Sequence, residues 1–170
     1  MEQVLRTGSV LLFLSLFVAD VCYAQLLGPG GKEIDVIQVE EAPVIDGVLD
    51  DKAWEFATVI EDLHEVNPDE FDPPSERSTI YVVYTRDALY IAARFWDSEP
   101  DRITARVLKQ GNRLNNEDRV GLVLDPFNDK RSGYQFELNP NGVRSDGLFK
   151  NPIQLAPAWD GIWHGDARSF

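Results

Sequence analysis

The chain is poor in cysteine and in positive charge. Cys22 is the single cysteine among 170 residues, so the chain has no second cysteine for an internal disulfide and must rely on core packing for stability. Lys and Arg number 16 against 29 Asp and Glu, which gives a net charge of −13. Because nucleic-acid binding needs a positive face for the phosphates, the sequence predicts no nucleic-acid partner.

Two other features are scarce: long apolar runs and helical periodicity. The main apolar run, residues 10–19 (VLLFLSLFVA), is too short to cross a bilayer as a helix. No stretch repeats apolar residues at the 3.6-residue spacing of a long helix. The length suits one domain and not comfortably two.

The N-terminus has the features of a secretory signal. Arg6 places a positive charge before the apolar run, and Cys22 and Ala24 are small residues three positions and one position before the predicted cut. We expect residues 1–24 to be a signal peptide, and the protein to be periplasmic, outer-membrane-associated or secreted. A lipoprotein cut before Cys22 is the alternative, although Val21 is a poor match for the small residue that such a cut usually follows.

The rest of the chain shows strand patterns. Residues 25–35 begin with QLLGPGGK, a glycine- and proline-rich stretch that indicates a linker. Residues 78–84 (STIYVVY) and 88–97 (ALYIAARFWD) are rich in β-branched and aromatic residues and predict a hairpin. Further strands are predicted over residues 33–41, 118–124, 134–138, 142–149 and 159–167.

Two segments suggest other local structure. A short helical turn is expected before Trp54, with Asp50 as its N-cap. Residues 103–108 fit either a strand or a helical turn. Short strands separated by Asp, Asn, Gly and Pro turns indicate an all-β fold, an antiparallel β-sandwich of the immunoglobulin or jelly-roll kind. Residues 167–170 (ARSF) read as the middle of a strand, so we expect the last hairpin of the sandwich to be missing.

Four segments carry a family resemblance. They are PVIDGVLDDKAW (43–54), SERSTIYVVYTRDALYIAARFWDSEPDRITAR (75–106), EDRVGLVLDPFNDKRSGYQFELNPNGVRSDG (117–147) and WDGIWHGDAR (159–168). In this order they resemble the N-terminal domain of large bacterial envelope proteins, which is similar to family 9 carbohydrate-binding modules. The resemblance covers residues 36–170. It implies a β-sandwich, a glycan ligand, a link to glycan breakdown and a downstream outer-membrane barrel as partner.

The sugar clamp of that family is not matched. Family 9 modules hold a terminal sugar between two tryptophans backed by charged and amide side chains. One tryptophan position falls here on Asn115 or Asn116, and a basic position falls near Glu137. The second tryptophan belongs to a final segment that this chain lacks. The resemblance therefore implies the fold more firmly than it implies the clamp.

Aromatic residues are the first candidates for sugar contact, because sugars present flat C–H faces that stack on rings. Trp159 and Trp163 are four positions apart near an Asp-Gly turn. They could contact a sugar or plug the end of the sandwich. Trp54 and Trp96 lie in apolar local patterns and are expected in the core. The predicted ligand-binding residues are Trp159, Trp163, Asn115, Asp118 and Glu137.

The strand around Glu137 has one apolar and one polar face. Tyr134, Phe136 and Leu138 share the first, and Gln135 and Glu137 share the second. The polar face is the part of this strand that we expect to touch a ligand. Arg119 on the preceding strand is a candidate ion-pair partner for Glu137.

Catalytic residues are not evident. Glycosidases need two carboxylates roughly 5–10 Å apart, whereas adjacent Glu117 and Asp118 would point to opposite faces of a strand. The two histidines, His64 and His164, are expected at the surface. We therefore predict no intrinsic activity. A further alternative is that the chain is part of a glycoside hydrolase that acts on O-glycosyl bonds.

One turn offers oxygen ligands for a hard cation. Asp125, Asn128 and Asp129 lie close together in sequence, and Ca²⁺ accepts such ligands. An Asp-Pro turn capped by Asn and Asp side chains explains the same residues without an ion. The leading expectation is a non-catalytic carbohydrate-binding module, and the alternative is a periplasmic structural or interaction module of an outer-membrane protein.

Overall fold

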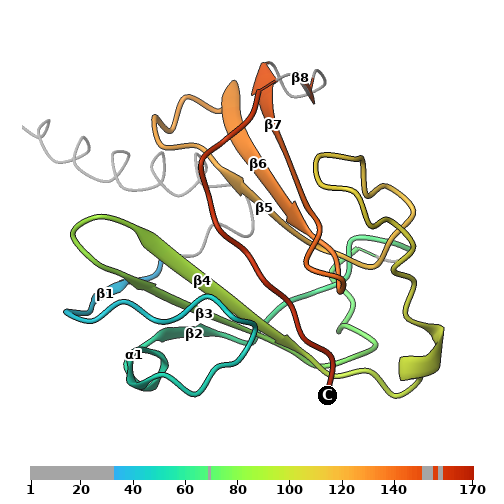
Figure 1. Cartoon of the computed structure of the whole chain (residues 1–170), viewed down its shortest axis with the longest axis horizontal. Coiled ribbons are helices and arrows are strands. Elements are labelled where there is room, and N and C mark those ends of the chain that lie inside the picture. Colours follow the sequence, from blue (N-terminus) through green and yellow to red (C-terminus); the bar gives the residue numbers. More distant parts are fainter. Residues whose placement is uncertain (1–32, 69, 151–154, 157–158) are drawn as a thin grey trace, which may run out of the picture. The chain divides into compact units, whose positions relative to one another are not determined.

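The structure is a computed structural model and describes residues 33–68, 70–150, 155–156 and 159–170 (Figure 1). The chain divides into two compact units, Met1–Ile34 and Asp35–Phe170, and the fold below is that of the second. The predicted signal peptide lies outside the described residues. Within the described ranges, no helix is long and apolar enough to span a membrane.

The first sheet is organised around β3 (Ser78–Tyr84), which pairs antiparallel with β4 (Leu89–Phe95) along its whole length. The predicted hairpin is therefore confirmed. β3 also pairs antiparallel with β2 (Thr58–Ile60) and parallel with β1 (Ile37–Gln38). β2 was not predicted, because three residues are too few to show an alternating pattern.

A single helical turn precedes β2. α1 (Lys52–Glu55) begins after Asp51, which takes the N-cap position that the sequence predicted for Asp50. The carboxylate of Asp51 makes no cap bond and instead accepts a hydrogen bond from Val44 N at 3.2 Å. Trp54 is buried, as predicted, and α1 contacts β3. The aromatic ring therefore covers part of the first sheet.

Trp96 is not a core residue, and the prediction that it would be is wrong. The side chain follows the last residue of β4 and is 37% exposed. The guanidinium of Arg77 lies 4.3 Å from its ring centroid and also binds Glu61 at 2.8 Å. A position just past the end of a strand has no neighbouring strand to cover it, so a charged side chain takes that place.

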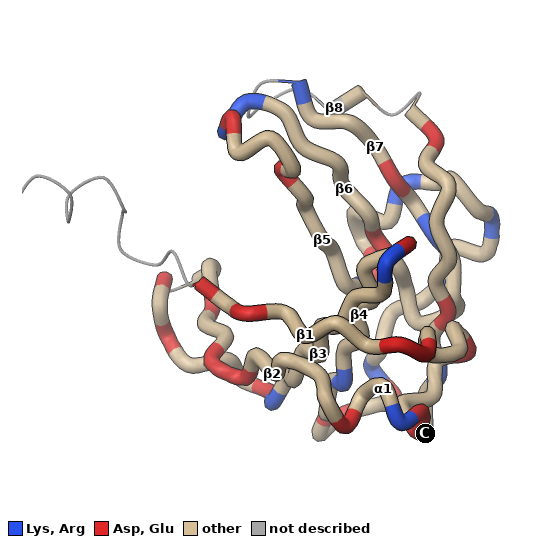
Figure 2. Tube along the Cα trace, turned by 90° about the vertical axis from the view of Figure 1, so that its left-hand side faces the viewer, with Lys and Arg blue, Asp and Glu red and all other residues tan. Residues whose placement is uncertain are grey.

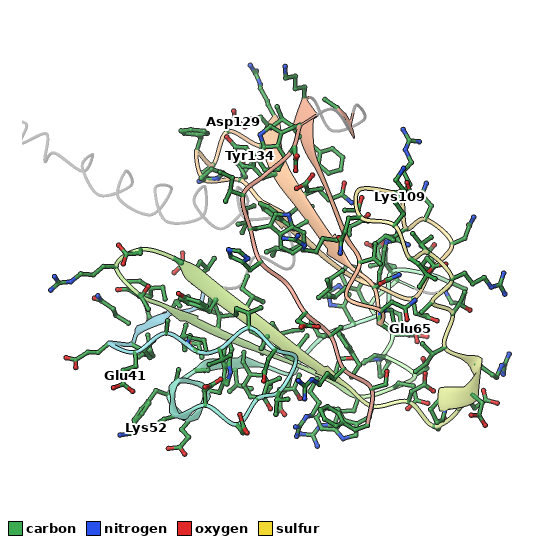
Figure 3. The ribbon with its side chains drawn as sticks, viewed as in Figure 1. Glu41, Lys52, Glu65, Lys109, Asp129 and Tyr134 are labelled. Carbon is green, nitrogen blue, oxygen red and sulfur yellow. The ribbon has the colours of Figure 1, made fainter. Side chains whose placement is uncertain are left out.

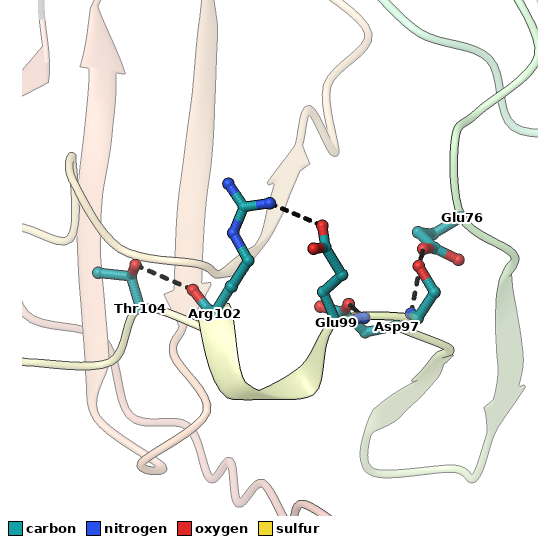
Figure 4. Close-up of polar contacts among 6 residues, drawn as sticks. Glu76, Asp97, Glu99, Arg102 and Thr104 are labelled. Carbon is teal, nitrogen blue, oxygen red and sulfur yellow. Dashed lines mark hydrogen bonds and ion pairs between the residues drawn. The ribbon is translucent and has the colours of Figure 1, made fainter.

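The connection after β4 begins with a compact turn (Figure 4). η1 (Pro100–Arg102) is a 3-10 turn whose Arg102 binds Glu99 at 2.7 Å. Ser98 donates to Glu76 Oε1 from its backbone N, at 3.0 Å, and from its hydroxyl. These bonds join the turn to the segment that leads into β3.

The second sheet contains four antiparallel strands in chain order. They are β5 (Val120–Leu124), β6 (Ser132–Leu138), β7 (Arg144–Lys150) and β8 (Leu155–Ala156). The first three agree with the predicted strands to within two residues. The molecule is thus mostly β, with two mostly antiparallel sheets.

Residues 159–170 run as an extended chain that joins neither sheet (Figure 1). The prediction of a strand over residues 159–167 is therefore wrong with respect to pairing. Residues 103–108, for which a strand or a helical turn was predicted, form neither and are irregular. In both segments, backbone groups form hydrogen bonds with side chains and not with the backbone of a neighbouring strand.

Candidate functional site

The two predicted tryptophans lie against β6. Ring centroids are 5.0 Å apart for Tyr134 and Trp159, 5.9 Å for Phe136 and Trp159, and 5.3 Å for Phe136 and Trp163. Both Phe136 contacts are edge-to-face, which is a favourable geometry for aromatic rings. All four side chains are half-buried, and Figure 3 marks Tyr134 on its strand. We call these four residues the aromatic cluster.

The register of the second sheet explains the cluster. Phe136 lies opposite Asp146 and Leu138 lies opposite Arg144, so these side chains share one face with Tyr134. Residues 159–163 cross this face. Sequence reasoning found the tryptophans but missed Asp146 and Arg144. The signal that could have found them is an Arg and an Asp at alternate positions of a strand next to an aromatic one.

Asp146 and Arg144 fasten the second tryptophan. Asp146 Oδ2 accepts hydrogen bonds from Gly161 N at 3.0 Å and from Trp163 Nε1 at 2.9 Å. Arg144 NH1 donates to Trp163 O, and its guanidinium lies 5.5 Å from the centroid of the Trp163 ring. Within the described residues, no donor reaches Asp146 Oδ1. The site thus combines half-exposed aromatic surface with a free carboxylate oxygen.

Glu137 lies on the other face of β6. Its Oε1 accepts hydrogen bonds from Arg119 Nε at 2.9 Å and from Gln135 Nε2 at 2.8 Å. The predicted pairing of Arg119 with Glu137 is confirmed. Glu137 is only 8% exposed, and the two-residue period of a strand directs it away from Phe136. The predicted ligand residues therefore do not gather in one place.

Asn115 and Asp118 lie in the exposed segment before β5. Asp118 Oδ2 accepts from Thr104 N at 2.6 Å, and Asp118 N donates to Thr104 O at 2.9 Å. Asn115 follows Leu114, whose carbonyl accepts from Arg119 at 2.7 Å. The chain thus brings these two residues toward Arg119 and Glu137 and not toward the tryptophans.

Glu117 holds the preceding loop. Its Oε2 accepts from Arg106 N at 2.7 Å, Val107 N at 3.1 Å and Asn139 Nδ2 at 3.2 Å. Burial is the largest single influence and on its own raises the pKa of Glu117, but the hydrogen bonds together lower that pKa below its ordinary value. Because β5 begins only at Val120, the alternation assumed for adjacent Glu117 and Asp118 does not apply.

The candidate calcium turn is closed by its own hydrogen bonds. Asp125 Oδ1 accepts from Phe127 N at 3.2 Å and Asp129 N at 3.3 Å, and its Oδ2 accepts from Lys130 N at 2.8 Å. Asn128 has a positive φ of 50°, which Asn tolerates better than most residues. Asp125 therefore acts as the cap of a tight turn.

Asp129 completes the same turn (Figure 3). Its carboxylate accepts from the backbone N and the hydroxyl of Ser132 at 2.8 and 2.9 Å, and from Arg131 N at 2.7 Å. These bonds, the one from Ser132 N first, lower the pKa of Asp129. In the described part of the chain, no group of three or more His, Cys, Asp or Glu side chains could hold a metal ion. The donor set fits a capped turn better than a calcium site.

Comparison with known proteins adds no assignment. No protein-family model, curated protein or solved structure matches the chain. The likeness to family 9 carbohydrate-binding modules therefore rests on the four sequence segments alone.

Proposed function

We propose that the chain is an exported, non-catalytic carbohydrate-binding module built as a β-sandwich of the family 9 type. Its ligand platform is the aromatic cluster with Asp146. The observation that carries this proposal is the pair Trp159 and Trp163, half-exposed and held edge-on against the rings of β6. Two mostly antiparallel sheets support the sandwich.

The chemistry of the cluster suits a sugar. Indole rings offer flat apolar surface to the C–H faces of a pyranose. Asp146 Oδ1 offers an acceptor for a hydroxyl group next to that surface, while Oδ2 is already used. The net charge of −13 disfavours uronate or sulfated glycans. We therefore expect a neutral glycan as ligand.

The test is titration of the full chain against a panel of neutral glycans. We expect Trp159→Ala and Trp163→Ala each to weaken binding about tenfold, about 1.4 kcal/mol, because each removes a stacking face. Trp96→Ala is the matched control, since this exposed tryptophan lies outside the aromatic cluster, just past the end of β4 in the other sheet. Near-UV circular dichroism verifies the fold of each variant.

Two results would contradict the proposal. The first is that the folded chain binds no glycan of the panel. The second is that binding is lost in Glu137→Gln and unchanged in the Trp159 and Trp163 variants, which would place the ligand on the opposite face of β6.

A second candidate function has its own observation. Leu89, Ile91 and Phe95 lie on one face of β4 and are 47%, 37% and 54% exposed. Exposed apolar patches of this kind mark protein-interaction surfaces. This favours a periplasmic module that binds protein, such as an adjoining outer-membrane barrel. Ile91→Asp should then abolish co-sedimentation with outer-membrane vesicles, and Val59→Asp on the exposed side of β2 should not.

A further inference from the structure

The segment that crosses the aromatic face of β6 carries the same short unit twice. Residues 159–165 read WDGIWHG, so each tryptophan is followed two positions later by a glycine. We call residues 159–161 and 163–165 the two Trp-Gly units. Because the units are four positions apart in an extended chain, both indoles start on the same side of it. The burial agrees, since the odd-numbered residues of this segment are half-buried and the even-numbered ones are exposed.

Each glycine leaves room for the ring that precedes it. A Cβ atom on Gly161 would lie 2.6 Å from Cη2 of Trp159, and a Cβ atom on Gly165 would lie 3.0 Å from Cζ3 of Trp163. Both distances are below the favourable carbon–carbon separation of about 3.5–4.0 Å. In both units the indole therefore lies close over its glycine, in space that any larger residue would fill.

The two indoles also meet β6 in the same way. Each is edge-to-face with Phe136, at an interplanar angle of 75° for Trp159 and 74° for Trp163. Their centroids lie 5.9 and 5.3 Å from that of Phe136. Among the described rings, the two indoles contact Phe136 and do not contact each other. The two units thus present equivalent but separate aromatic rings.

Asp146 joins the two units. Its Oδ2 accepts hydrogen bonds from Gly161 N of the first unit, at 3.0 Å, and from Trp163 Nε1 of the second unit, at 2.9 Å. Its Oδ1 accepts no hydrogen bond from the described residues. The open acceptor therefore belongs to a carboxylate that is bound to both units.

We propose that the two Trp-Gly units are two subsites, and that the ligand is a neutral oligosaccharide that lies across both; this rests on the function proposed above. A pyranose ring is about as large as one six-membered aromatic ring, so a single sugar that stacks on one indole does not cover the other. Two units of one sugar chain cover both, and a hydroxyl group between them meets Asp146 Oδ1. Phe136, which contacts both indoles, takes up space that one sugar held between them would need.

Ligand length tests the number of subsites. Titration calorimetry of the full chain compares glucose with cello-oligosaccharides of two to four units, and the matching xylose and mannose series. We expect the affinity to rise about tenfold or more from the monosaccharide to the longer members of the series that binds, because the second indole adds a stacking face. Equal affinity for the monosaccharide and the oligosaccharides would overturn the two subsites and leave carbohydrate binding in place. Binding of no glycan would overturn both proposals.

Glycine variants test one subsite at a time. Gly161→Ala puts a methyl group where the outer ring of Trp159 lies, so this indole must move. We expect the affinity for the trisaccharide to fall about tenfold, toward that of the monosaccharide, while the affinity for the monosaccharide and the thermal midpoint stay near those of the parent. Gly121→Ala in β5 is the matched control, because the nearest atom to its Cβ would be Cγ of Glu137 at 3.9 Å.

A double variant tests the contact itself. A phenyl ring at position 159 lacks the outer ring of the indole, so Gly161→Ala should cause no further loss of trisaccharide affinity when it is added to Trp159→Phe. A Gly161→Ala variant that binds the trisaccharide as tightly as the parent would remove Trp159 from the site. An equal loss for the monosaccharide and the trisaccharide would mean one shared sugar position and would overturn the two subsites.

Discussion

At the scale of single residues, carboxylates in this molecule serve mainly as backbone caps. Glu117, Asp118, Asp125 and Asp129 all accept hydrogen bonds from main-chain N–H groups. This use explains why an acidic chain can hold long irregular loops, since each ionised carboxylate replaces part of a missing ladder. It also makes the loops sensitive to acid, because a protonated carboxyl is a weaker acceptor.

Glu117 provides the test of this role. Its pKa is lowered in the folded state, so its contribution to stability is present above the unfolded pKa of about 4.3 and is lost as the pH falls through the folded value. We expect Glu117→Gln to lower the thermal midpoint at pH 7, and the difference from the parent to shrink at pH values below about 4. Thermal unfolding from pH 3 to pH 7 measures this.

Glu55→Gln is the control, because this exposed residue on α1 accepts no side-chain hydrogen bond within the described part of the chain. Its midpoint should follow that of the parent at each pH. If Glu117→Gln lowers the thermal midpoint as much at pH 3 as at pH 7, packing and not the charge of Glu117 holds the loop.

At the scale of elements, the sequence predicted the hairpins and failed on the segments that side chains hold. β3, β4, β5 and β6 were found because their apolar alternation and their polar turns are local signals. Residues 103–108 gave no local signal, since their partners are side chains 10 or more positions away: Glu117 and Asp118, and, more than 30 positions away, Asn139 and Asn141. Residues 159–167 were assigned as a paired strand because alternation reports which side chains are buried and not whether the backbone has a partner.

Only part of the candidate site could be predicted from the sequence. Tryptophan is a strong signal at any position, so Trp159 and Trp163 were found. Asp146 and Arg144 depend on the pairing of β6 with β7, which one strand alone does not reveal. The same pairing separates Glu137 from the tryptophans, although the three were grouped as one site by residue type.

Asn139 tests how the β6–β7 turn holds the loop. It is 1% exposed, its Nδ2 donates to Val107 O at 3.0 Å, and its Oδ1 accepts from Val143 N at 2.9 Å. Asn139→Ala would leave the buried Val143 N and the part-buried Val107 O without these partners, at a cost of about 2–3 kcal/mol. Urea unfolding measures the loss. Asn141→Ala, an exposed change in the same turn, should cost less than half as much, and equal losses would contradict the ranking.

At the scale of the whole molecule, the excess of negative charge is the dominant feature. Figure 2 shows acidic residues on strands of the second sheet, where Glu137 and Asp146 lie, and on the loops that connect the strands. Ion pairs join Glu61, Glu99, Glu137 and Asp46 to arginines within the described part of the chain, whereas the whole sequence carries 29 acidic residues against 16 basic ones. The folded state therefore brings like charges together, and this repulsion opposes the packing of a small core.

Salt should relieve that repulsion. Between 10 and 150 mM ionic strength the screening length falls from about 30 to about 8 Å, so distant like charges stop interacting while short ion pairs such as Arg119–Glu137, at 2.9 Å, are little affected. We expect the thermal midpoint to rise over this range. The measurement is a melting series in NaCl at micromolar protein concentration and neutral pH. Replacing two adjacent exposed acidic residues, in the double variant Glu40→Lys and Glu41→Lys, reduces the net charge from −13 by four units and should flatten the rise. A midpoint that falls with salt would mean that the few ion pairs, and not the overall repulsion, dominate the electrostatics of the fold.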